Sequence, residues 1–271
     1  MSLTARLSVR GRWAPGAAVL LMLVLVAVWI VAGGDRSTSI GLPAGEGARP
    51  TGMTTQPPSG PGSLASRQQR ELEQSINAMR AVAAVEPAPS PQYPAVSGQA
   101  RQQPDLYAAA FVAELLTQDY RTSGREELQA WVQSESAQST DPLVVGLTPA
   151  GLRSRMAVAS VQDGVNGPGP VPSQSDWAKL GSRQGHTSVQ IQHVSEPVSW
   201  ASAVANAQIT DPGVTARQVD AEVTLQTTDH GKTTLQRFSV SLVVNLEGHP
   251  VRDGYGFVAA ITYNVAARGR P

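Results

Sequence analysis

Cysteine is absent from this 271-residue chain, which excludes disulfide frameworks, thiolate zinc sites and cysteine nucleophiles. The histidines form neither an HExxH motif nor another close metal-binding pair; they are His186, His193, His230 and His249. No G-x-S-x-G nucleophile motif occurs, and the adjacent acids Glu126 and Glu127 lie on a predicted exposed helix face. The sequence therefore predicts no catalytic residue, no metal and no cofactor.

Lysine is scarce, because only Lys179 and Lys232 occur and every other basic side chain is an arginine. The 21 basic side chains balance 21 acidic ones over the whole chain, whereas residues 105–271 carry 12 basic and 16 acidic side chains, a formal charge of −4. Sequence-independent nucleic-acid binding needs clustered lysine and arginine, so direct binding of nucleic acid is not expected. The glycine-rich run 164–170 lacks the lysine of a phosphate loop, so no nucleotide site is predicted.

One long hydrophobic run stands near the start of the chain. Residues 13–34 hold no charged side chain, and Ala17 to Ala32 are apolar throughout. A helix of about 20 apolar residues crosses the hydrocarbon core of a bilayer. Three arginines lie in residues 1–12, so the positive-inside bias predicts a cytoplasmic N-terminal tail and an extracytoplasmic remainder. We expect a single-pass cell-membrane protein; the alternative is a cleaved signal peptide, which also leaves the remainder outside the cytoplasm.

Residues 35–104 are predicted to be a Pro/Gly-rich linker, because they hold ten of the 20 prolines but one aromatic residue, Tyr93. A short helix at about 64–85 interrupts this linker. Its apolar side chains follow a 4-3-4 spacing: Leu72, Ile76, Met79 and Ala83. Such a short seam fits either a marginal, solvated helix or a self-association stalk just outside the membrane.

Residues 105–266 are predicted to form one α+β domain, followed by a disordered tail at 267–271. Apolar residues at helical spacing indicate helices at about 106–120, 124–132 and 149–156. Alternating apolar and polar residues then indicate strands at about 189–193, 219–226, 238–246 and 257–265, with a poorly supported fifth strand at 200–209. Asp229-His230-Gly231-Lys232 is typical of a hairpin turn. Two or three helices would cover one face of a curved antiparallel sheet of about four or five strands.

This order of elements resembles the nuclear transport factor 2-like cone, in which N-terminal helices lie across a curved antiparallel sheet. With its tail, membrane helix and linker, the chain resembles the bitopic scaffold subunits of type IV secretion and conjugation machines, in particular the TcpC family of Gram-positive conjugative elements. The segment 111–120 and the capped helix 126–131 are similar to the first helix pair of that family. TcpC-type proteins can carry two such domains, whereas this chain has length for one. The resemblance implies a non-enzymatic role, with other channel subunits and a second copy of the chain as partners.

Side chains expected to face the interior of the cone are candidate pocket residues. They are Tyr107, Tyr120, His193 and Tyr263, and the alternative is that the tyrosines are core aromatics with a polar tip. Trp177 falls in a predicted Pro/Gly/Ser-rich loop, where it is either an exposed interaction residue or folded down to plug the cone. Two further functions stay open: an extracytoplasmic ligand- or partner-binding accessory protein, for example of a lipid importer, and a cone-pocket isomerase or hydratase.

Overall fold

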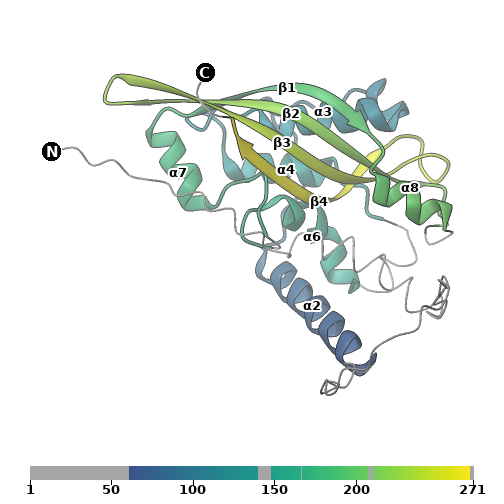
Figure 1. Ribbon diagram of the computed structural model, residues 1–271. Helices are drawn as coiled ribbons and strands as arrows, with labels where there is room; N and C mark the ends of the chain where they lie inside the picture. The colour runs from purple at the N-terminus through teal and green to yellow at the C-terminus, as the bar shows by residue number, and fades with distance from the viewer. Residues whose placement is uncertain (1–60, 140–147, 166, 207–208, 210, 269–271) are drawn as a thin grey trace, which may run out of the picture.

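Figure 1 shows the computed structural model, which describes residues 61–139, 148–165, 167–206, 209 and 211–268. The predicted cytoplasmic tail, the predicted membrane span at 13–34 and the first part of the linker lie outside the described residues, as do the last three residues of the predicted tail. Within the described ranges, no helix is long and apolar enough to cross a membrane. The described part has the expected α+β class, with helices packed on an antiparallel sheet.

The sheet is a meander in which each strand pairs antiparallel with the next one along the chain. Its strands are β1 (His186–Ser195), β2 (Val214–Asp229), β3 (Lys232–Glu247) and β4 (Gly256–Ala267). The period-2 pattern is confirmed, because Val219 on β2 and its partner Leu242 on β3 are fully buried on the inner face. On the outer face the paired Asp220 and Ser241 remain partly accessible.

The fifth strand predicted at 200–209 is wrong, because Val198–Ala205 forms helix α8. Trp200 and Ala203 lie three residues apart, so a helix places them on one side, and both are buried. Alanine and serine fill the positions between them. Alanine has the highest helix propensity and little preference for strands, so a short window of small residues could not be assigned from alternation.

Helices cover the inner face of the sheet. They are α3 (Pro104–Leu116), α4 (Arg125–Ser134), α6 (Ala150–Val161) and α7 (Gln174–Ser182), with a 3₁₀ turn η1 (Ala100–Gln102) before α3. Helix α3 contacts β1 and β2, and α6 contacts β4. An aromatic stack joins the layers, because the Phe111 ring lies 5.1 Å from Trp131 and 4.3 Å from Phe257. The first two predicted helices are confirmed as α3 and α4, although α3 ends at Leu116 and does not reach Tyr120. The third predicted helix continues past Met156 to Val161.

The end of the predicted linker belongs to the packed domain. Tyr93 and Val96 are buried in the core cluster, the Trp131 indole N–H donates to the Pro94 carbonyl at 3.0 Å, and Tyr93 Oη donates to Gln118 Oε1 at 2.5 Å. These side chains pack against α3 and α4, so the domain begins earlier than residue 105. Proline-rich composition could not show this, because one tyrosine and one valine are enough to anchor an extended segment.

The predicted helix at 64–85 is helix α2 (Pro61–Ala81), which begins earlier and ends earlier than expected. It lies against α6, with Met79 buried and Ile76 partly buried. Arg155 of α6 donates to the Val82 carbonyl at 2.9 Å, just beyond the helix end, where carbonyls lack helical donors. The middle of the predicted seam, Ile76 and Met79, therefore packs within the same chain, whereas Ala83, which follows the helix, is exposed.

Candidate functional site

Two of the candidate aromatics form a T-shaped pair. Trp177 and Tyr120 lie with their ring centroids 4.8 Å apart and their planes at 74°. Burial raises the pKa of Tyr120 to about 12. Burial also holds the pKa of Tyr263 well above its usual value, with smaller contributions from Tyr120 and from the Asp163 carboxylate. All three aromatics lie against the core, as expected for tyrosines with a polar tip.

The prediction of a loop around Trp177 is wrong, because Trp177 lies on helix α7. Its side chain is buried, with 6% of its surface exposed. Ser173 caps this helix by accepting from the Asp176 backbone N–H at 3.2 Å. The Trp177 indole N–H donates to the Ser123 carbonyl at 3.3 Å. The Trp177 ring therefore packs between α7 and the start of α4, and it is not available as an exposed contact residue.

Tyr107 lies apart from that cluster and contacts a carboxylate that the sequence analysis missed. Its hydroxyl donates to Glu135 Oε2 at 3.0 Å. Arg101 Nη2 forms an ion pair with the same oxygen at 2.6 Å, and the Val96 backbone N–H donates to Glu135 Oε1 at 3.1 Å. Burial, followed by the Glu135 charge, raises the pKa of Tyr107 well above its usual value. The side chain of Glu135 is 1% exposed.

A buried glutamate beside a tyrosine is a possible acid–base pair, yet here both carboxylate oxygens accept hydrogen bonds from the chain itself. The arrangement ties residues 96–101 to the end of α4, which is a structural task. A signal for it exists in the sequence. Glu135 continues the helical spacing of the buried Leu128 and Trp131, so an acid stands on the apolar stripe.

His193 does not face the inside of the sheet. Strand β1 has a bulge between Ile191 and His193, so that Gln192 is unpaired and the alternation reverses. His193 then pairs with Asp220 on the outer face and is exposed, while Val194 takes the inward position beside Val219. The prediction for His193 is wrong, because one extra residue moves every later side chain to the opposite face.

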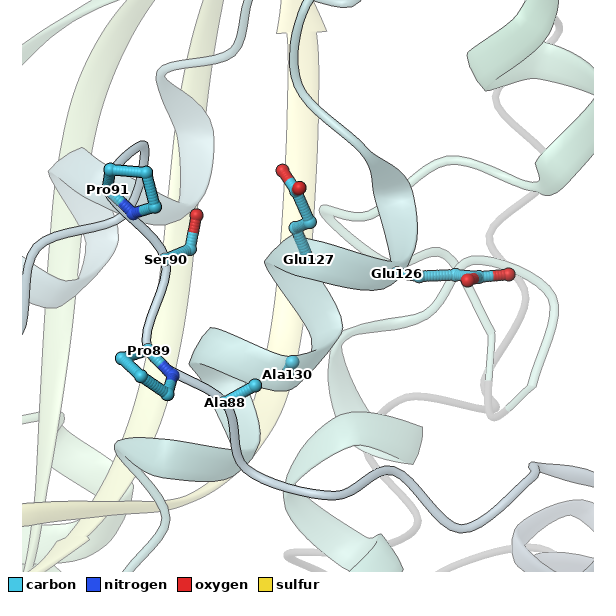
Figure 2. A pocket seen from close by; sticks show the side chains of 7 residues that line it. All are labelled: Ala88, Pro89, Ser90, Pro91, Glu126, Glu127 and Ala130. Atoms are coloured by element: carbon cyan, nitrogen blue, oxygen red, sulfur yellow. The ribbon is translucent and has the colours of Figure 1, made fainter.

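A pocket of about 320 Å³ lies between the segment 88–91 and the first turn of α4. Figure 2 shows its lining, in which Glu127 points alongside Ser90 and Pro91 whereas Glu126 is directed away from them. The remaining lining residues are Ala88, Pro89 and Ala130. None of the candidate aromatics lines this pocket, and in the part of the chain that the structure describes no three metal-ligating side chains come together.

The β2–β3 hairpin extends past both neighbouring strands, and we refer to residues 227–236 as the hairpin tip (Figure 1). Pairing of β2 with β3 continues to Asp229 and Lys232, whereas β1 pairs with β2 only as far as Gln226, and β4 pairs with β3 only as far as Phe238. The predicted turn is confirmed. His230 and Gly231 have φ of 50° and 76°, as a type I′ turn requires.

The two sides of the hairpin tip differ. On the β2 side, the Thr228 backbone N–H donates to the Arg183 carbonyl at 2.7 Å. On the β3 side, the last contact is at Arg237, whose carbonyl accepts from the Arg268 N–H at 2.9 Å. Beyond it, the stretch Lys232–Gln236 pairs with no strand of the described chain on that side. Leu235 is 57% exposed there.

Comparison with protein families, with curated proteins and with solved structures finds no match for this chain.

Proposed function

We propose that the chain is a non-enzymatic, membrane-anchored structural subunit of a conjugative, type IV secretion-like transfer complex. It acts through protein–protein contacts of its extracytoplasmic domain. Its partners are other channel subunits, and residues 13–34 hold it in the cell membrane with the N-terminus in the cytoplasm. The observation that carries the proposal is the hairpin tip, which extends beyond the packed sheet and leaves one strand edge without a partner strand among the described residues.

The proposed family fold is the nuclear transport factor 2-like cone. Support comes from the order of elements, in which α3 and α4 precede a four-stranded antiparallel meander; α3 packs on β1 and β2, and α4 packs on α6, which contacts β4. The aromatic stack of Phe111 between Trp131 and Phe257 fills the space between helices and sheet. A filled interior favours a structural role over a ligand-holding cone.

The hydrogen bonds and ion pairs of the buried acids also favour a non-enzymatic role. Glu135 is bonded to Arg101, Tyr107 and the Val96 backbone. Glu247, fully buried on β3, lies 3.1 Å from Arg252 and accepts from Ser139 at 2.6 Å. Both carboxylates hold chain segments together, so neither is free to take a proton from a substrate.

Affinity purification of tagged full-length protein from native membranes after mild crosslinking tests the proposal. Channel subunits or a secretion ATPase should be recovered, identified by mass spectrometry. Recovery of lipid-import components would instead favour the binding-accessory alternative, and recovery of a bound small molecule without protein partners would favour a pocket function. A matched sample lacking residues 1–34 controls for contacts made through the membrane segment.

Protease accessibility tests the topology. Protease added to protoplasts should cleave the extracytoplasmic part and leave a short membrane-protected N-terminal fragment. Full protection of the chain would reverse the proposed orientation.

A further inference from the structure

On the open side of β3 in the hairpin tip, backbone groups find no hydrogen-bond partner within the part of the chain that the structure describes. Backbone N–H and C=O groups of successive strand residues point to alternate sides of the strand. Arg237 directs its carbonyl toward the β4 side, where it accepts from Arg268. Residues at even separations from Arg237 do the same, so Leu235 and Thr233 direct their N–H and C=O groups to the open side. An exposed strand edge of this kind is a template for an added strand.

Two unpaired cations flank this open stretch. Lys232 and Arg237 are exposed, and among the described residues neither makes an ion pair, whereas the neighbouring Arg268 is paired with Glu222 at 2.6 Å. Lys232 and Arg237 are five positions apart, an odd difference, so their side chains lie on opposite faces of the strand. Asp229 is the cross-strand partner of Lys232, but its carboxylate contacts His230 Nδ1 at 2.7 Å. A strand added beside Thr233 and Leu235 would therefore meet a basic side chain at each end, one on each face.

The same charges argue against a second copy as the occupant. A symmetric antiparallel pairing of two copies is centred on an outward-pointing residue such as Leu235, which places Arg237 opposite Thr233 of the other copy. The stretch 232–237 holds no acidic side chain, so neither cation would meet an acid of the other copy. Lysine on an edge strand is also a common protection against self-pairing.

We propose that the edge Lys232–Arg237 binds an extended strand of a partner protein that carries acidic side chains at its two ends. The partner strand continues the sheet in line with β4 and bonds to the backbone of Thr233 and Leu235. This proposal rests on the proposed function and names the chemistry of its partner. Backbone hydrogen bonds supply the affinity and the two flanking ion pairs select the acidic sequence.

The test uses the full chain in detergent micelles and two synthetic peptides. One is acetyl-Thr-Glu-Val-Thr-Val-Thr-Glu-Thr-amide, whose glutamates are spaced as Lys232 and Arg237 are; the other replaces both glutamates with lysine. The acidic peptide should bind with an affinity that falls as salt is added, and the lysine peptide should bind at least about tenfold more weakly. Amide hydrogen exchange at Thr233 and Leu235 should slow in the complex. Equal binding of both peptides, or no binding of either, would overturn the proposal.

Leu235→Pro removes the outward N–H at the centre of the edge. Because this N–H does not point to β2, the β2–β3 ladder loses no donor, and proline is tolerated at such edge positions. The matched variant Leu235→Thr changes the side chain and keeps the N–H. Leu235→Pro should lower the affinity for the acidic peptide by about tenfold, the effect of one lost hydrogen bond. The affinity of Leu235→Thr should stay within about twofold of the wild-type value. Equal affinities of the two variants for the acidic peptide would overturn the proposed hydrogen bond from the backbone N–H of residue 235.

The wild-type comparison of the two peptides stands even if Leu235→Pro fails to fold. Self-association of the chain that Leu235→Pro abolishes would place a second copy on the edge and overturn the acidic-strand proposal. Recovery of channel subunits from membranes without peptide binding would overturn the edge proposal alone. Peptide binding without recovery of channel subunits would overturn the proposed function alone.

Discussion

The packed end of the domain and the hairpin tip use the same sheet in opposite ways. At the packed end, strands β3 and β4 lie under helices, the Phe111 ring stacks on Phe257, and the carboxylates of Glu135 and Glu247 are buried in ion pairs. At the hairpin tip, two paired strands continue beyond β1 and β4 with exposed side chains on β3. Burial concentrates the stability at one end and leaves the other end free to make contacts.

This division predicts a gradient in the effects of substitution. Changes at the packed end should lower the free energy of unfolding, because they open cavities or strand buried charges. Changes on the open side of the hairpin tip should leave stability nearly unchanged and alter binding alone.

The largest expected effect comes from Phe111→Ala. Phe111 is fully buried and stacks on Trp131 and Phe257, so the substitution removes a large apolar contact and leaves a cavity. We expect a loss of about 4 kcal/mol in the free energy of unfolding, measured by urea titration. Leu235→Ala is the control and should change it by less than about 0.5 kcal/mol. Equal losses in the two variants would remove the distinction between the regions.

Glu135→Ala should have the second-largest effect and lower the free energy of unfolding by about 3 kcal/mol. The substitution leaves the Arg101 guanidinium without its buried partner and removes the carboxylate that accepts from the Tyr107 hydroxyl. Chemical denaturation of this variant is compared with that of Glu126→Ala, an exposed acid on the same helix. Indistinguishable midpoints would show that the Arg101–Glu135 pair does not hold residues 96–101 in place.

A pH titration of stability probes the Tyr120–Trp177 pair. The pKa of Tyr120 rises from 10.0 to about 12 on folding, so the unfolded chain releases this proton at lower pH than the folded chain. The stabilisation is complete below pH 10.0 and should be lost as the pH rises from 10.0 to about 12. Tyr120→Phe should have a shallower alkaline decline in melting temperature. An unchanged slope would place the responsible protons elsewhere.

Gly231→Ala is expected to have the smallest of these effects. Gly231 has φ of 76°, which strains any residue with a Cβ. The substitution should therefore lower the free energy of unfolding by about 1 kcal/mol. Gly98→Ala, at a position with open space around the added Cβ and no positive φ, serves as the matched control. A loss at Gly231 as large as that of Phe111→Ala would mean that the hairpin tip carries much of the domain's stability.

The α+β class, the first helices, the four strands and the turn at Gly231 could be predicted from the sequence. Each is encoded locally: strands β2, β3 and β4 have clean alternation, and Asp229–Lys232 contains the residues that a tight hairpin demands. The position of Tyr263 near the core also follows from the alternation of β4, whereas Tyr120 lies beyond the end of α3, where its backbone N–H donates to the Gly185 carbonyl.

What the sequence analysis missed depends on contacts between distant segments. The bulge at Gln192 moved His193 to the outer face, because pairing with β2 decides which residue is left out. Trp177 is the exception, because the Ser173 cap that starts its helix is a local feature. Glu135 was overlooked because its partner Arg101 comes from a segment that composition assigned to the linker. The acid on the apolar stripe is visible in the sequence, but no local pattern identifies Arg101 as its partner or β2 as the strand that sets the bulge.

Site-specific photocrosslinking in native membranes tests the central claim most directly. A photoreactive residue at position 235, in the hairpin tip, is compared with one at position 198, which is 83% exposed at the far end of the sheet on α8. The proposed function predicts crosslinks to channel subunits of a transfer complex from position 235, with fewer or none from position 198. Crosslinks from position 198 alone, or crosslinks to lipid-import components, would contradict it.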